Sequence, residues 1–313
     1  MGAPAASGDA QPGGVTTPRG AARPREDLGG PSSPAKAART VQALEAATLD
    51  EPLSYEMLED LPEHELSVPD GQTAASTAAG KKEALEMLTH YGVFEDIPES
   101  DSGSLKMLRA RWEPQARKGE EGVKWRYVAQ EFKWMEDRDD CFAASSSAAT
   151  SRLVDFVALK EGRASFVGDC VKAYYQAEQT EAVCVRPPRE HLLARAAAGL
   201  RTDVVWRLKR MLPGQRVAGA GWVATAAKKL TAQGFERNPA CPQFFYRERD
   251  KALLEVHMDD FHGCVPPEGG EAVLSELREM FDLKAGDAVM HGRYQHLKRE
   301  MLRLEDRTLI RPK

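Results

Sequence analysis

The sequence predicts an α+β fold in which an antiparallel sheet packs on helices, behind a disordered N-terminal segment. Residues 1–80 are rich in Ala, Gly, Pro and Ser and show no sustained period of 2 or 3.6, a pattern typical of disorder. From Lys81 onward, short apolar runs of strand length are mixed with segments of helical periodicity. Because strands and helices mix without a strict βαβ repeat, an α+β sheet is favoured.

The predicted elements follow from the apolar periodicity and from the glycines that end the helices. In the helix at 147–161, the periodic apolar residues are Leu153, Phe156, Val157 and Leu159. A polar, glycine-bounded turn at 117–122 suits the tip of a hairpin. Helices are predicted at 54–60, 81–91, 147–161, 189–199, 222–233 and 268–281. Strands are predicted at 108–112, 123–132, 164–167, 182–185, 204–208, 243–246, 252–257 and 261–265.

Composition is typical of an intracellular globular protein. Hydrophobic residues are 42% and charged residues 29% of the 313-residue chain, which is long enough for a sizeable core. No run of about 18 apolar residues and no secretory signal is present, so we expect no membrane association and a location in the cytoplasm or nucleus. The five cysteines are scattered and odd in number, which predicts reduced core thiols rather than disulfides or a zinc knuckle.

The net charge of -5 is dominated by one segment. Residues 41–70 contain nine acids and no Lys or Arg, and the segment 1–80 is therefore acidic as well as of low complexity. Two other segments are basic: 104–133 holds eight Lys or Arg against four acids, and 298–313 holds six against three. Such clusters can contact nucleic-acid phosphates, and the alternative is alternating charge on a solvated surface.

Three aspartates are candidate metal ligands. Asp169 follows the apolar strand at 164–167, and Asp259 and Asp260 lie between two apolar runs. A tight hairpin would bring that pair beside the neighbouring strand end, and carboxylates on rigid elements suit a pair of hard divalent ions. Most Asp-Asp pairs are solvated turns, but the apolar neighbours Val256 and Met258 favour a ligand-binding role here. Since successive strand side chains face opposite ways, Asp259 is expected to dominate.

The residues around these aspartates resemble two motifs of reverse transcriptases. Gly168-Asp169-Cys170-Val171-Lys172-Ala173-Tyr174 looks like the Asp-x-x-x-Ala-aromatic motif. Val256-His257-Met258-Asp259-Asp260 looks like the aromatic-x-Asp-Asp box, and the two occur in the expected order.

Further matches point to the copia-type retrotransposon class. The segment 124–132 resembles its fingers strand K-A-R-L-V-A-K-G-F. Cys141-Phe142-Ala143 with 150–153 resembles T-F-A-P-V followed by I-R-L-L. The segment 206–214, continuing to Trp222, resembles L-K-K-S-L-Y-G-L-K-Q-x-P-R-A-W. The likeness covers residues 104–313, and six motifs in order are more specific than any one of them.

This resemblance implies the fingers and palm of a right-hand polymerase over 81–313. The implied activity is that of an RNA-directed DNA polymerase, the reverse transcriptase domain of a Pol polyprotein from a transposable element. This nucleotidyltransferase would add dNTPs to the primer on an RNA or DNA template. Asp169, Asp259 and Asp260 would be its catalytic residues and would bind two Mg²⁺ ions, or Mn²⁺ in their place.

The resemblance also implies nucleotide-binding residues. Arg126 falls where a fingers arginine grips the triphosphate, and Lys118 at the hairpin tip is a second candidate. Tyr174 falls at the steric-gate position that selects deoxynucleotides. Gln215 falls in the loop beneath the nucleotide, and Met258 near the primer end. The alternatives are a solvated strand-face charge for Arg126 and a core aromatic for Tyr174.

Three departures from the family pattern keep a second interpretation open. His257 replaces the usual aromatic residue, and its alternative is a packed strand residue rather than a metal ligand. The loop 216–221 lacks the expected proline and polar nucleotide contact. The segment 297–312 looks like the closing palm hairpin, so we expect a domain truncated before the thumb. The alternative function is a catalytically silent remnant, or an adopted host protein, that retains the fold and nucleic-acid binding.

Overall fold

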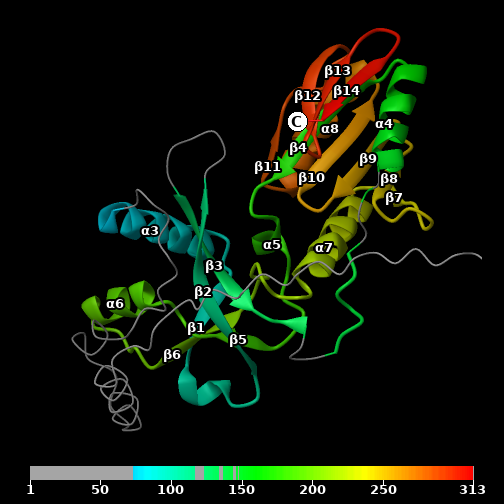
Figure 1. Ribbon diagram of the computed structural model, residues 1–313. Coiled ribbons are helices and arrows are strands. Elements are labelled where there is room, and N and C mark those ends of the chain that lie inside the picture. The colour runs from blue at the N-terminus through cyan, green and yellow to red at the C-terminus, as the bar shows by residue number, and fades with distance from the viewer. Residues whose placement is uncertain (1–72, 117–122, 134–136, 144–145, 147, 313) are drawn as a thin grey trace, which may run out of the picture. The chain divides into compact units, whose positions relative to one another are not determined.

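The computed structural model describes residues 73–116, 123–133, 137–143, 146 and 148–312 (Figure 1). These residues belong to one compact unit, Asp50–Lys313. They form helices and three sheets, which confirms the predicted α+β class. The segment 1–72 with its predicted helix at 54–60, and the turn 117–122 that carries Lys118, lie outside the described residues.

One sheet has five strands in the order β1-β6-β5-β2-β3. All neighbours in it are antiparallel except β2 and β5, which pair in parallel. A parallel pair needs a long crossover, and the chain between β2 and β5 provides one. The strands are β1 Phe94–Pro98, β2 Lys106–Ala116, β3 Val123–Gln130, β5 Val183–Val185 and β6 Val204–Leu208.

Helix α3 (Ala74–His90) covers the core of this sheet and starts earlier than predicted. The sequence predicts a helix from Lys81, whereas the first helical residue is Ala74. Thr73 is the N-cap and forms a capping box with Ser76, so the first turn has its backbone N–H groups satisfied locally. Residues 74–80, expected to be disordered, therefore belong to the folded part.

A second sheet has six antiparallel strands in the order β11-β4-β10-β9-β8-β7. Helices α7 (Ala218–Ala232) and α8 (Gly270–Met280) share the main core with one face, and α4 (Ala148–Lys160) shares a smaller core with the other. Side chains alternate along a strand, so Phe261 joins the main core and Cys264 joins the smaller one. The strands are β4 Ala164–Cys170, β7 Glu236–Arg237, β8 Phe244–Arg247, β9 Ala252–His257, β10 Asp260–Val265 and β11 Leu283–Ala285.

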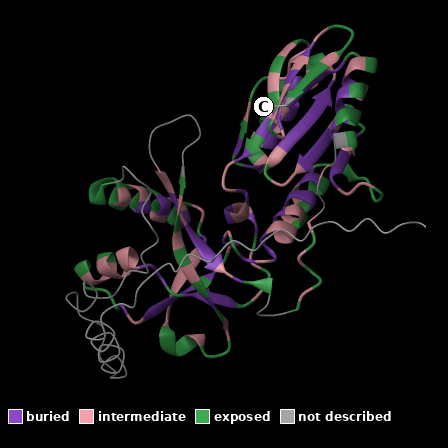
Figure 2. Cartoon of the chain, viewed as in Figure 1, coloured by how far each residue is buried: buried purple, intermediate pink, exposed green. Residues whose placement is uncertain are grey.

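Helix α4 packs with a different face from the one that its apolar periodicity predicts. Leu153 and Phe156 are 47% and 58% exposed, whereas Val154 and Ala158 are fully buried against the sheet. Figure 2 shows buried residues along the strands and exposed residues on the outer side of this helix. The buried face also carries Asp155, because polar groups on the sheet face offer it partners. Because this buried face includes a polar residue, the apolar periodicity of the sequence did not identify it.

The third sheet has three antiparallel strands, β12 (Gly292–His296), β13 (Arg299–Arg303) and β14 (Thr308–Pro312). The hairpin predicted over 297–312 is confirmed as β13 and β14, and β12 is an additional strand. The guanidinium of Arg303 is buried and donates to Ser165 Oγ of β4 over 2.5 Å and to the Ala158 carbonyl over 2.9 Å. This arginine therefore ties the third sheet to the second sheet and to α4.

The remaining elements are short. They are α5 Ala173–Gln176, α6 Arg189–Ala197, and the 3₁₀ helices η1 Glu99–Ser102 and η3 Pro267–Gly269. The sequence did not predict α5, β1, β7 or β11, because two to five residues show no period. None of the described helices combines the length and apolar character needed to cross a membrane. All five cysteines are free thiols. Cys170, Cys184 and Cys264 are buried as predicted, whereas Cys141 and Cys241 are half-buried rather than core residues.

The fold predicts unequal costs for two alanine substitutions at glycines with positive φ. A Cβ at Gly214 (φ +87°) would lie 2.0 Å from the backbone oxygen of Ala129, whereas Gly162 (φ +61°) has open space around it. We expect Gly162→Ala to lower the free energy of unfolding by about 1 kcal/mol, from its backbone conformation alone. Gly214→Ala should lower it by about 2 kcal/mol more, because the Ala129 backbone must move. Urea denaturation measures both, and equal losses would contradict the packing described for Gly214.

Candidate active site

The candidate aspartates come together because β10 lies between β4 and β9 in the second sheet. In this register Asp260 lies directly opposite Asp169 of β4. Asp259 lies in the turn between β9 and β10, and the Cys170 backbone N–H donates to its carbonyl oxygen over 2.7 Å. The hairpin therefore holds both acids beside the end of β4, the juxtaposition that the sequence predicts.

The turn that carries Asp259 has only two residues, Met258 and Asp259. Met258 has a φ of +54°, a conformation that non-glycine residues rarely adopt. The indole N–H of the buried Trp222 on α7 donates a hydrogen bond to the Met258 carbonyl. This contact holds the backbone of the turn at Met258. Trp222 in turn packs edge-to-face on Phe281, with ring centroids 5.8 Å apart. The sequence places Trp222 in a family motif but gives no sign of this anchoring contact.

Asp169 and Asp259 line one pocket with a volume of about 440 Å³. Of the predicted site residues, Arg126, Tyr174 and Met258 line it as well. One wall comes from the stem of the β2–β3 hairpin, and the other comes from the end of β4, α5 and the β9–β10 turn. Asp169 and Asp259 are both exposed residues in the lining of this pocket.

Asp260 and Gln215 lie outside the lining of this pocket. Asp260 is half-buried, and burial, followed by the charge of Asp259, raises its pKa. Gln215 is buried, and its side-chain oxygen accepts from the Leu212 backbone N–H over 2.7 Å, so it holds the loop together from inside. Lys118 lies outside the described residues.

His257 is a packed strand residue in the structure. Its ring Nδ1 accepts a hydrogen bond from the Ser146 backbone N–H over 2.9 Å, and the ring is half-buried on β9. It does not line the pocket. The sequence kept this alternative open beside a metal-binding role, and the hydrogen bond favours it.

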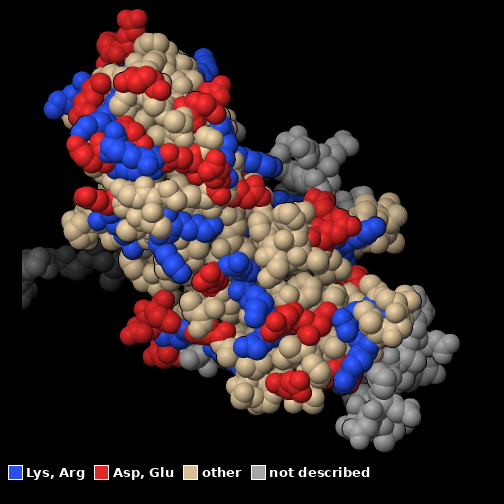
Figure 3. All heavy atoms as spheres, turned by 180° about the vertical axis from the view of Figure 1, so that it is seen from behind, with Lys and Arg blue, Asp and Glu red and all other residues tan. Residues whose placement is uncertain are grey.

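The pocket also gathers basic side chains that the sequence did not single out. Lys124 lies two residues before Arg126 on β3, Lys172 precedes α5, and Lys284 of β11 lies directly opposite Asp169. Together with Arg126 these side chains outnumber the two carboxylates in the lining. On the face drawn in Figure 3, Lys and Arg are interspersed with Asp and Glu. The pocket lining, by contrast, has more basic than acidic side chains. It supports binding of a polyanion such as a phosphate chain.

Four side chains in the pocket lining have shifted pKa values, and burial raises those of Cys170 and Tyr175 to about 12. Burial, followed by repulsion from Lys124 and Arg126, lowers the pKa of Lys172 to about 8. Burial, followed by the charge of Asp259, raises the pKa of Tyr174. Tyr174 is half-buried and packs against the main core, so its ring is held in place where it reaches the pocket.

The carboxylates suit hard divalent ions but do not converge as a compact triad. Asp169 and Asp259 are exposed residues that line one pocket, and carboxylate oxygen is the donor type that Mg²⁺ prefers. Within the described residues, one group of three His, Cys, Asp or Glu has ligand atoms within 4.8 Å of one another, and it contains none of the three aspartates. The pocket therefore offers two candidate carboxylates directly, with Asp260 adjacent.

The lowered pKa of Lys172 predicts a pH-dependent affinity for phosphate anions. Lys172 carries its charge below about pH 8 and loses it as the pH rises through that value. We expect inorganic tripolyphosphate to bind up to about tenfold more weakly at pH 9 than at pH 7, corrected for ionisation of the anion. Calorimetric titration of the wild type and of Lys172→Met measures this. Since the variant cannot titrate at this position, the same residual pH dependence in both proteins would contradict the assignment.

No protein-family model matches the chain, and a search of curated proteins finds no match. In structure the chain is similar to a foamy viral protease-reverse transcriptase in complex with double-stranded DNA, with a TM-score of 0.42 and 10% identity over 87% of this chain and 44% of that chain. It is also similar to apo telomerase from Candida tropicalis truncated from its C-terminal domain, with a TM-score of 0.40 and 7% identity over 74% of this chain and 60% of that chain. The chain thus spans less than two thirds of either protein, and these likenesses concern the fold alone.

Proposed function

We propose that this chain is the fingers and palm of an RNA-directed DNA polymerase of the copia-type retrotransposon class. The observation that carries the proposal is that Asp169 and Asp259, from two motifs 90 residues apart, line one pocket opposite basic side chains. The reaction is attack of a primer 3′-hydroxyl on the α-phosphate of a dNTP, with release of pyrophosphate. The motif resemblance supplies the polymerase class, and the pocket supplies the matching chemistry.

The carboxylates fit the metal ions that this reaction uses. When bound, a pair of Mg²⁺ or Mn²⁺ ions would activate the attacking hydroxyl and neutralise the triphosphate. Asp169 and Asp259 would hold them from the end of β4 and from the β9–β10 turn. The strained Met258 and the Trp222 contact keep the turn rigid, which a precise ligand position requires. Asp260, opposite Asp169, would add a third carboxylate from β10.

The pocket walls fit the parts of a nucleotide. Arg126, Lys124 and Lys172 would bind the phosphate chain, with the guanidinium giving a bidentate contact. Tyr174 would lie under the sugar and exclude a 2′-hydroxyl, because its ring is packed in place. Met258 would contact the primer end, and Gln215 would shape the loop beneath the nucleotide from its buried position. An RNA or DNA template with its primer would be the macromolecular partner.

The second candidate function is nucleic-acid binding without polymerisation. The surplus of basic over acidic side chains in the pocket favours it, because phosphate binding needs those cations and no catalysis. A polymerase would also use these basic side chains, to bind the triphosphate of the incoming nucleotide. A binding assay and an extension assay on the same protein separate the two functions.

Substitution of Asp259 tests the polymerase directly. We expect Asp259→Asn to reduce primer extension with Mg²⁺ or Mn²⁺ at least about 100-fold, since one metal-binding oxygen is lost. Asp306→Asn, in an exposed turn paired with Arg307, is the matched control and should extend as the wild type does. Extension is read on a labelled DNA primer annealed to RNA.

Two results would count against the polymerase. Equal extension by the wild type and Asp259→Asn would show that the activity belongs to a contaminant. Salt-sensitive binding of the primer-template by the wild type with no extension would instead support the second candidate function.

Substitution of Tyr174 tests the role of the ring in sugar selection. We expect Tyr174→Val to raise the incorporation of ribonucleotides relative to deoxyribonucleotides by about 10-fold or more, because the clash with the 2′-hydroxyl is removed. Tyr174→Phe keeps the ring and should keep the selectivity. The ratio of kcat/KM for dCTP and CTP measures both variants. Unchanged selectivity in Tyr174→Val would show that Tyr174 is a core aromatic residue with no part in sugar selection.

A further inference from the structure

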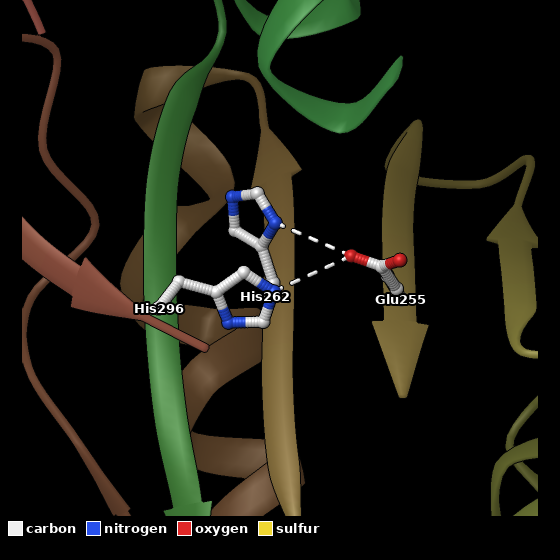
Figure 4. A group of neighbouring side chains, drawn as sticks. All are labelled: Glu255, His262 and His296. Atoms are coloured by element: carbon white, nitrogen blue, oxygen red, sulfur yellow. Dashed lines mark ion pairs between the residues drawn. The ribbon is translucent and has the colours of Figure 1, made fainter. Parts of the chain in front are cut away.

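A buried group of two histidines and a glutamate contains none of the three aspartates. Figure 4 shows Glu255 of β9, His262 of β10 and His296 of β12 pointing toward one another. Glu255 and His262 are directly opposite each other in neighbouring strands. The three residues are 0%, 0% and 5% exposed. Neither the family motifs nor the proposed polymerase reaction uses any of them.

The distances in this group suit one small cation. Glu255 Oε2 lies 3.5 Å from His262 Nδ1 and 3.5 Å from His296 Nε2. The three ligand atoms all lie within 4.8 Å of one another. Ligands at about 2.0–2.1 Å from a tetrahedral Zn²⁺ are about 3.4 Å apart. The two distances from Glu255 Oε2 to the histidine nitrogens are therefore close to those of a zinc site.

The polar atoms in this group are buried, and their distances to one another are longer than those of ordinary hydrogen bonds. Both carboxylate oxygens of Glu255 and both ring nitrogens of His262 are inaccessible to solvent and make no hydrogen bond of good geometry with the described residues. Their ionisable neighbours lie at 3.5 Å: His262 and His296 for Glu255, and Asp155 and Glu255 for His262. Despite burial, interactions with the two imidazoles and with the Ser146 and Thr150 hydroxyls lower the pKa of Glu255. Buried polar atoms are costly in this state, and a native structure normally supplies a partner or an ion. A cation between Glu255 and the two imidazoles would satisfy Oε2 and one nitrogen of each ring.

We propose that Glu255, His262 and His296 bind a Zn²⁺ ion. Two imidazole nitrogens and one carboxylate oxygen are a donor set that suits zinc and other late first-row metals. Mg²⁺ prefers oxygen ligands alone and is not expected here. The site is therefore chemically distinct from the pair Asp169 and Asp259, which offers oxygen only.

A carboxylate lies behind one of the two imidazoles, as is common at zinc sites. His262 Nε2 lies 3.5 Å from Asp155 Oδ1 on α4, and the same oxygen accepts a hydrogen bond from the Tyr294 hydroxyl over 2.6 Å. A carboxylate behind a metal-binding histidine fixes its tautomer and ring orientation. Ser151 Oγ lies 3.5 Å from His296 Nε2, where the hydroxyl or a water can complete four-coordination.

Such a site would be structural, because its ligands are closed off from solvent and come from two different sheets. Glu255 and His262 belong to the six-stranded sheet, and His296 belongs to the three-stranded sheet. His262 lies two residues after Asp260 on the same strand and faces the same side. Zinc would thus brace the strand that carries Asp260.

Metal analysis of the full chain tests this proposal. We expect the purified wild type, stripped with EDTA and then given Zn²⁺ alone, to retain about one ion per chain after dialysis and to unfold at a higher temperature than the stripped protein. Glu255→Gln and His296→Gln should lose both effects. His291→Gln, at an exposed position nearby in the chain, should keep both. The double variant Asp169→Asn with Asp259→Asn should also keep both, since its site is separate.

Two outcomes overturn the proposal: a wild type that retains no Zn²⁺, or retention that is unchanged in Glu255→Gln and His296→Gln. Should those variants fail to fold, X-ray absorption of the zinc-loaded wild type decides. Imidazole and oxygen neighbours at about 2.0–2.1 Å support the site, and a sulfur shell at about 2.3 Å assigns the ion to the cysteines. None of these readouts depends on polymerase activity, so a failure to extend a primer leaves this proposal standing.

Discussion

The backbone pairing of β10 with β4 on one side and β9 on the other is the constraint on which the candidate site depends. It brings Asp169 and the Asp259 turn together from distant parts of the chain, and a hydrogen bond from Cys170 closes the contact. A slip of one residue in this register would turn Asp260 and His262 to the opposite face of the sheet. The anchoring of the turn by Trp222 and the packing of Tyr174 both presuppose this register.

Burial changes stepwise along β10 and divides it into two chemical environments. Asp259 in the turn is exposed, Asp260 is half-buried, and His262 is fully buried beneath α4. Exposed carboxylates can exchange ions and substrates with solvent, whereas buried ones need a permanent partner. The same strand can therefore serve an open pocket at its start and a closed, structural group two residues later. The basic side chains of Lys124, Arg126, Lys172 and Lys284 lie with the acids of the open pocket.

Much of the fold could be predicted because local patterns agree with it. The strand at 204–208 and the β9–β10 hairpin appear where the apolar runs place them. The start of α3 was missed because an Ala-rich segment looks disordered unless its cap at Thr73 is recognised. The face of α4 was missed because its buried side includes Asp155 and Ser151, which no hydrophobic pattern marks. Both errors arose where hydrogen bonding, rather than hydrophobicity, decides the packing.

The sequence by itself determined the α+β class and the three candidate aspartates, because strand-length apolar runs and motif spacing are local properties. Only the tertiary structure decided which acids share a pocket and that Lys124, Lys172 and Lys284 join them. It alone brought Glu255, His262 and His296 together, since their spacing in the chain resembles no metal-binding motif. The physical reason is strand register. Hydrogen bonding between strands sets which side chains are neighbours, and this pairing cannot be inferred from the sequence of one segment alone.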